Sequence, residues 1–113
     1  MNERETLIWA AGVLEGCGTV ASHIVQGPTR MYHQISLLAV TGNPEVNARL
    51  IDALGNGIEV SAPSGAPCFV IDGYAGVRGI LEQVWKYLTP HTRHEFNGEL
   101  KRFKLLSKGQ LGS

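Results

Sequence analysis

The sequence has few cysteines, modest charge and no long hydrophobic run, and each shortage excludes a class of protein. Its two cysteines, Cys17 and Cys68, lie far apart without metal-ligand spacing, which argues against a zinc module and favours reduced thiols. Charged residues make up 18% and hydrophobic residues 43% of the chain, so intrinsic disorder is not indicated. No apolar run has the length of a membrane span, and the Asn2–Glu5 start is unlike a signal peptide. We therefore expect a cytoplasmic or nucleoid-associated protein that is not secreted.

The chain has 113 residues, enough for one domain with one core, and its net charge of zero conceals an uneven distribution. Residues 1–85 carry four basic and eight acidic side chains, whereas residues 86–113 carry six basic and two acidic ones. A basic segment on an acidic body can contact nucleic acid or another acidic partner. A solvated helix face explains the same segment equally well, so charge alone does not assign a partner.

Hydrophobic periodicity and turn residues predict eight elements. Pro44 suits the first turn of a helix with Asn43 as its cap, and Gly55 ends that helix. In chain order we predict a helix at 5–16, strands at 19–26 and 30–41, a helix at 44–54, strands at 58–61 and 68–72, and helices at 74–88 and 92–106. This order predicts an α+β fold, in which two hairpins form one antiparallel four-stranded sheet with helices on one face. Residues 107–113 are predicted to be a flexible tail.

Residues 9–20, WAAGVLEGCGTV, are the most informative segment of the chain. Glycine inside a helix costs about 1 kcal/mol relative to alanine, a cost that is tolerated where another group must approach closely. The segment resembles the motif of the LAGLIDADG homing endonucleases. Residues 1–106 also resemble a single domain of that family in the order of their elements, with a saddle-shaped sheet. Weaker similarities follow in the family's order at Val40–Thr41, Leu54–Ile58 and Tyr87–Leu88.

The resemblance implies a homodimer, because one motif is half of the family's working unit. In the family, two motif helices pack side by side along a two-fold axis. We expect Ala11, Gly12 and Glu15 at this interface, where the small residues let two backbones approach. The alternative is a helix buried beneath the sheet of a monomer.

The resemblance also places the family's catalytic positions on Glu15, Cys17 and His91. Family members cleave DNA with divalent metals such as Mg²⁺, and the second acidic position of the motif supplies a metal ligand. That position is Cys17 here, and a soft, mostly protonated thiol is a poor ligand for Mg²⁺. Glu15 is the remaining candidate metal ligand, although it points to another side of the helix. His91 is the nearest match to a lysine that family members often carry before the last helix, so we expect cleavage to be lost or reduced.

In the family, the exposed face of the sheet reads the major groove through polar side chains on alternate strand positions. The residues expected to contact DNA here are His23, Arg30, Gln34, Ser36 and Arg93. Few of them are cationic, whereas a protein that neutralises several phosphates usually presents more basic side chains. Family-style recognition of a long DNA site is therefore expected to be weakened.

Three functions remain open from the sequence. The leading interpretation is a homodimeric, double-stranded DNA-binding protein with little or no cleavage. The second is an active, site-specific endonuclease that depends on Mg²⁺ and uses Glu15 or unrecognised ligands. The third is an interaction or structural protein whose exposed sheet face carries Ala21, Val25, Leu38 and Val60. The strand register decides whether these four side chains share a face, since a slip of one residue exchanges the two faces.

Overall fold

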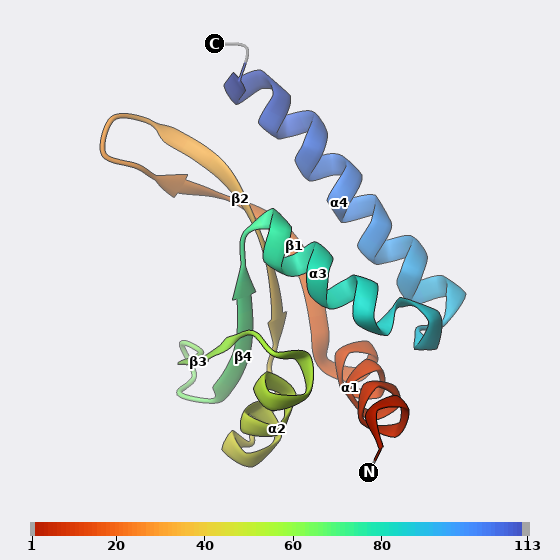
Figure 1. Cartoon of the computed structure of the whole chain (residues 1–113). Helices are drawn as coiled ribbons and strands as arrows, with labels where there is room; N and C mark the ends of the chain where they lie inside the picture. The colour runs from red at the N-terminus through yellow and green to blue at the C-terminus, as the bar shows by residue number, and fades with distance from the viewer. Residues whose placement is uncertain (1, 112–113) are drawn as a thin grey trace.

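The computed structural model describes residues 2–111, with side chains through residue 107, and shows one four-stranded sheet with its helices packed on one side (Figure 1). The elements in chain order are α1 (Glu3–Cys17), β1 (Gly18–Gln26), β2 (Met31–Ala39), α2 (Pro44–Leu54), β3 (Ile58–Ser61), β4 (Pro67–Asp72), α3 (Tyr74–Val84), the 3-10 turn η1 (Trp85–Tyr87) and α4 (Pro90–Leu111). The strands pair antiparallel in the order β1-β2-β4-β3. The predicted α+β class, element order and hairpins are confirmed.

Several helix ends differ from the prediction: α1 and α4 begin earlier and end later than predicted, and α3 ends at Val84, before the short turn η1. α1 continues through Cys17, because the Gly18 N–H still bonds to the Leu14 carbonyl and the backbone becomes extended only at Gly18. A Cβ at Gly18 would collide with that carbonyl oxygen, which explains why glycine follows the helix. α4 continues to Leu111, so residues 107–111 of the predicted tail are helical, while residues 112 and 113 lie outside the described part. No described helix is both long and apolar enough to cross a membrane.

The start and end of α2 follow from its flanking residues. The Asn43 side chain accepts hydrogen bonds from the N–H groups of Glu45, at 2.9 Å, and Val46, at 3.4 Å. Pro44 occupies the first turn, and Gly55 ends the helix in the left-handed conformation with φ 71°. These local signals are visible in the sequence itself, and the predicted bounds of α2 are confirmed.

The core lies between the helices and one face of the sheet. Alternate strand residues supply the sheet side, including Ile35, Leu37 and Phe69, all fully buried. The helices contribute Ala10, Ala11, Leu14, Leu50, Leu54, Val77, Ile80, Leu81, Val84 and Phe96. Because all of these helices pack on the same side, no element within residues 2–111 covers the other face of the sheet (Figure 1).

A buried polar contact joins α2 to the sheet. Asn47 is fully buried, and among the described residues it is the one buried polar side chain. Its Nδ2 donates to Glu59 Oε1 at 2.9 Å, and its Oδ1 accepts from Thr41 Oγ1 at 2.5 Å. Glu59 therefore turns toward the helix side of β3, so its carboxylate is not on the uncovered face.

Candidate nucleic-acid interface

We call the helix-free side of the sheet the open face. In the β1–β2 pair, directly opposed residues share a face, so His23 lies beside Gln34 and Ala21 beside Ser36. The pairing of β4 with β2 and β3 extends the same face across the sheet. Its members are Thr19, Ala21, His23, Val25, Tyr32, Gln34, Ser36, Leu38, Ile58, Val60, Cys68, Val70 and Asp72. The register places Ala21, Val25, Leu38 and Val60 on this face, as the third interpretation requires.

A shallow hollow of about 300 Å³ lies on the open face and carries one acidic group. Its lining includes His23, Leu38 and the pair formed by Ser36 and Asp72. Ser36 Oγ donates to Asp72 Oδ1 at 2.5 Å. A carboxylate can accept a hydrogen bond from a base amino group but repels a phosphate. Sequence analysis missed Asp72, because only the register of β4 against β2 brings it beside Ser36.

Arg30, a cationic residue predicted to contact DNA, lies at the edge of the open face. None of the open-face residues named above is lysine or arginine, and Arg30 lies in the turn that joins β1 to β2. Gly27 N–H donates to the Arg30 carbonyl at 2.8 Å and closes this turn. The β1–β2 hairpin extends well beyond the other two strands, so Arg30 is placed at the tip of an arm (Figure 1).

Arg93 lies elsewhere and has a structural role. Its Nε donates to the Trp85 carbonyl at 2.9 Å, and its Nη2 donates to the Lys86 carbonyl at 3.1 Å. Arg93 thereby ties the start of α4 to η1 on the helix side of the molecule. The structure does not bring it to the open face with His23, Gln34 and Ser36, and its contact with DNA stays a prediction.

The end of α1 carries two of the predicted catalytic residues in different environments. Cys17 is the last helical residue, and it is exposed. The Glu15 carboxylate accepts a hydrogen bond from the backbone N–H of Thr89, just before α4. Glu15 therefore fixes the start of α4, a role that occupies one of its carboxylate oxygens.

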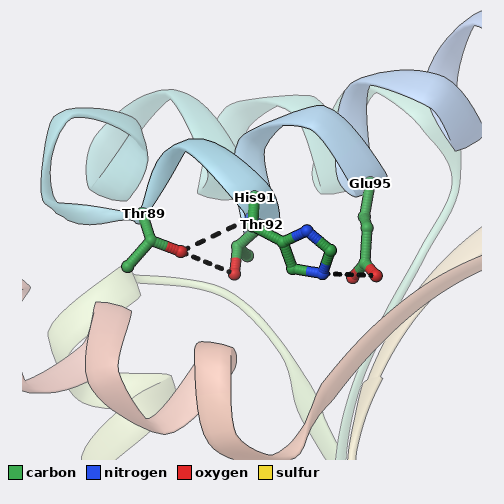
Figure 2. Close-up of polar contacts among 4 residues, drawn as sticks. All are labelled: Thr89, His91, Thr92 and Glu95. Carbon is green, nitrogen blue, oxygen red and sulfur yellow. Dashed lines mark hydrogen bonds and ion pairs between the residues drawn. The ribbon is translucent and has the colours of Figure 1, made fainter.

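His91 lies on the first turn of α4 and pairs with a residue of its own helix. Figure 2 shows its ring beside the Glu95 carboxylate, with Nε2 and Oε1 3.1 Å apart. The His91 side chain is 82% exposed. A hollow of about 320 Å³ separates this part of α4 from the first residues of β1, and two carboxylates, Glu95 and Glu99, border it.

The predicted catalytic residues do not form a site suited to Mg²⁺. Within residues 2–111, no three His, Cys, Asp or Glu side chains are placed to hold a metal ion together. Cys17 offers a thiol, Glu15 is bonded to Thr89, and His91 is paired with Glu95. Magnesium requires hard oxygen ligands in octahedral geometry, which this set does not supply.

The exposed side of α1 is formed by small residues. Gly12 and Gly16 are exposed, one turn apart, and Ile8 precedes them on the same side with 44% exposure. A Cβ built at Gly12 or Gly16 would meet nothing within 4 Å, so packing inside the chain does not require glycine there. Ala11 is only 1% exposed and packs in the core, so its side chain does not lie on this exposed side of α1.

The fold is shared with known proteins, although comparisons with protein-family models and with curated protein sequences find no match. The homing endonuclease I-CvuI, solved with its own target and Ca, is 20% identical with a TM-score of 0.76, over 96% of this chain and 71% of that one. I-CvuI with the I-CreI target and Mg is 21% identical with a TM-score of 0.74, over 92% and 69%.

A third solved structure covers a smaller part of its own chain. The LAGLIDADG homing endonuclease I-LtrWI, bound to target DNA, is 16% identical with a TM-score of 0.70, over 96% of this chain and 38% of that one. The chain therefore has the fold of the LAGLIDADG homing endonucleases, as the motif at residues 9–20 implied.

Proposed function

We propose that this chain is a homodimeric protein that binds double-stranded DNA and has lost most or all DNA cleavage. The observation that carries the proposal is the open face, where His23, Gln34 and Ser36 lie in register on neighbouring strands with no described helix above them. The side chains alternate as major-groove readout by a β-ribbon requires. The solved structures of the same fold described above were each determined with DNA.

The exposed side of α1 supports the homodimer. The axes of packed helices lie about 8–10 Å apart, depending on the side chains at the contact. Gly12 and Gly16 present a surface without bulk that allows close packing. A two-fold axis along this surface would make the same residues meet in both protomers. It would also join two open faces into one longer surface for DNA.

The chemistry at the end of α1 supports the loss of cleavage. Cys17 replaces the carboxylate that the family resemblance places at this position, and Glu15 is engaged with Thr89. The His91 ring is paired with the Glu95 carboxylate, whose negative charge offsets any positive charge on the ring. These groups offer little to stabilise negative charge at a phosphate.

Salt-dependent DNA binding tests the proposal directly. We expect a fluorescently labelled random-sequence duplex to bind and to dissociate between about 50 and about 200 mM salt, with a shallow slope because few cations are present. No binding at the lower salt concentration would refute the proposal. Plasmid DNA incubated with Mg²⁺ or Mn²⁺ should stay intact, and reproducible double-strand breaks would show that cleavage has been retained.

A second candidate function, a protein-interaction surface, is favoured by the apolar residues on the open face. Ile58 is 56%, Leu38 38% and Val60 37% exposed, and they lie close together across β2, β4 and β3. Such clustered exposed side chains are typical of protein contacts. Charge substitutions at Leu38 distinguish this function from DNA binding.

Leu38→Lys and Leu38→Glu should change DNA affinity in opposite directions. Leu38 lies at the centre of the open face, so a lysine there adds a phosphate contact and a glutamate adds repulsion. At about 50 mM salt we expect Leu38→Lys to tighten duplex binding by about 3- to 10-fold and Leu38→Glu to weaken it by a similar factor, measured by fluorescence anisotropy.

Leu105 provides the matched control, because it is 70% exposed on α4, away from the open face. Leu105→Lys and Leu105→Glu change the net charge equally and should leave duplex affinity within about twofold. If the Leu105 pair shifts the affinity as much as the Leu38 pair, overall charge and not the open face controls binding. If both Leu38 variants weaken duplex binding alike, the open face acts through its apolar side chains and not through charge.

Oxidation of Cys17 should link the two protomers covalently. Cys17 follows Gly16 at the proposed axis and is exposed, whereas Cys68 is 1% exposed. Two Cys17 thiols on crossing helices fall within disulfide reach when their Cα atoms are about 4.4–6.8 Å apart. Copper–phenanthroline treatment should therefore give a dimer on a non-reducing gel with Cys68→Ser but not with Cys17→Ser. Equal yields from both variants would contradict this placement of the axis.

A further inference from the structure

α3 and α4 lie on the helix side of the molecule (Figure 1). A groove lies between them, away from the open face. We call it the α3–α4 groove. It consists of two adjoining hollows of about 360 and 250 Å³, which share the residues Arg78, Asn97 and Leu100. The larger hollow adds Leu81, Glu82 and Trp85, and the smaller one adds Tyr74, Lys101 and Lys104. One end of the groove is therefore apolar and the other basic.

The basic end is built around the Tyr74 phenol. Lys104 Nζ lies 5.3 Å from the centroid of the Tyr74 ring, and the ring stacks on Phe103 at 5.8 Å with an interplanar angle of 19°. Lys104, with a smaller contribution from Arg78, lowers the pKa of Tyr74 below its usual value of 10.0. Lys104 and Arg78 thus both lie near the Tyr74 hydroxyl, and stacking on Phe103 holds the Tyr74 ring in place.

The positive charge at this end is largely uncompensated. Arg78 pairs with Glu82 at 3.0 Å, but no carboxylate of residues 2–107 pairs with Lys101 or Lys104. Two ammonium groups and a phenol O–H are donors suited to a phosphate group. The smaller hollow has room for such an anion.

The apolar end offers an aromatic surface and an amide. Trp85 and Leu100 are half-buried against the core and expose their remaining surface to the groove. Asn97 lies between the two ends, lines both hollows and is exposed. Aromatic side chains stack on planar bases, and an amide can bond to a base edge.

We propose that the α3–α4 groove binds a nucleoside monophosphate, with its base against Trp85 and Leu100 and its phosphate at Lys101 and Lys104. Asn97 bonds to the base edge, and the Tyr74 hydroxyl donates to the phosphate. The site lies within one protomer and on the side opposite the open face. It therefore does not depend on the homodimer or on DNA binding.

Tryptophan fluorescence tests this site with adenosine monophosphate as the probe. The chain has two tryptophans, so Trp9→Phe leaves Trp85 as the one reporter. We expect saturable quenching by adenosine monophosphate, with adenosine and inorganic phosphate each binding about tenfold more weakly or worse. Calorimetry on the unaltered chain should give the same order of affinities, which guards against an effect of Trp9→Phe on folding.

A second experiment removes positive charge from the basic end of the groove. Lys101→Ala combined with Lys104→Ala should weaken adenosine monophosphate binding about tenfold or more and leave adenosine binding unchanged. Lys86→Ala is the matched control, because Lys86 lies over Tyr87 outside the groove and should have no effect.

Three results would overturn the proposal. One is the absence of saturable binding at millimolar adenosine monophosphate. Another is equal binding of inorganic phosphate, which would mean that the nucleoside is not recognised. The third is displacement of adenosine monophosphate by duplex DNA, since that would assign these lysines to a DNA backbone contact. The binding should persist in the Gly12→Leu variant, so its failure is distinguishable from failure of the proposed dimer.

Discussion

Replacing Gly12 with leucine is expected to turn the proposed homodimer into monomers of 12.2 kDa. In the single chain a Cβ at Gly12 meets nothing within 4 Å, so the new side chain leaves the protomer undisturbed. At a two-fold axis, two leucines would face each other where two backbones meet. Overpacking of this kind costs about 3 kcal/mol, which is roughly a 100-fold loss in dimer affinity. Light scattering after size exclusion measures the mass directly.

Gly79→Leu is the matched control for this experiment. Gly79 is also an exposed helical glycine, on α3, and a Cβ there likewise meets nothing within 4 Å. Both variants should gain about 1 kcal/mol of helix stability, so any difference between them reflects the surface of α1. If Gly12→Leu and Gly79→Leu keep the same dimeric mass, the proposed interface does not exist. If the unaltered chain is already monomeric, the homodimer is refuted.

Gly57→Ala should have the largest effect on stability. Gly57 precedes β3 with φ 118°, a conformation that side chains rarely adopt, and its hydrogens face the buried Phe69 ring. An added Cβ would lie 2.9 Å from Phe69 Cζ and closer still to Cε2. Backbone strain and overlap together are expected to lower the free energy of unfolding by about 4 kcal/mol, measured by urea denaturation.

Gly55→Ala, two residues earlier, separates the two causes. Gly55 also has a positive φ, of 71°, but a Cβ there meets nothing within 4 Å. Only the left-handed backbone penalty applies, so we expect a loss of about 1 kcal/mol. Equal losses at the two positions would mean that contact with Phe69 contributes nothing. For a domain whose total stability is about 5–15 kcal/mol, the Gly57 variant should be close to unfolding at 37 °C.

Local chemistry explains why most elements were predictable. Asn43, Pro44 and Gly55 define α2 by capping, fixed φ and a left-handed end, all of which depend on neighbouring residues alone. The glycines around Cys17 likewise mark the passage from α1 to β1. The continuation of α1 through Cys17 was missed because the Gly16 signal preceded the true end at Gly18.

The two faces of the sheet were harder to assign from the sequence. β1 and β2 lack strict alternation of polar and apolar residues, so either face could have been the buried one. Pairing of His23 with Gln34 and of Ser36 with Asp72 fixes the open face and reveals an acidic group that strand composition did not place. The sequence also did not show that Arg93 hydrogen-bonds to the Trp85 carbonyl or that Ala11 is buried in the core, because both contacts join residues from different elements.

The sequence by itself determined the element order, the motif at residues 9–20 and the thiol where a carboxylate is expected, since these depend on residue identity and short-range spacing. Only the tertiary structure decided which side chains share the open face, which hydrogen bonds occupy Glu15 and Arg93, and that α3 and α4 enclose a groove. Those features arise from contacts between residues far apart in the chain. Their geometry is set by strand register and core packing, which no local pattern specifies.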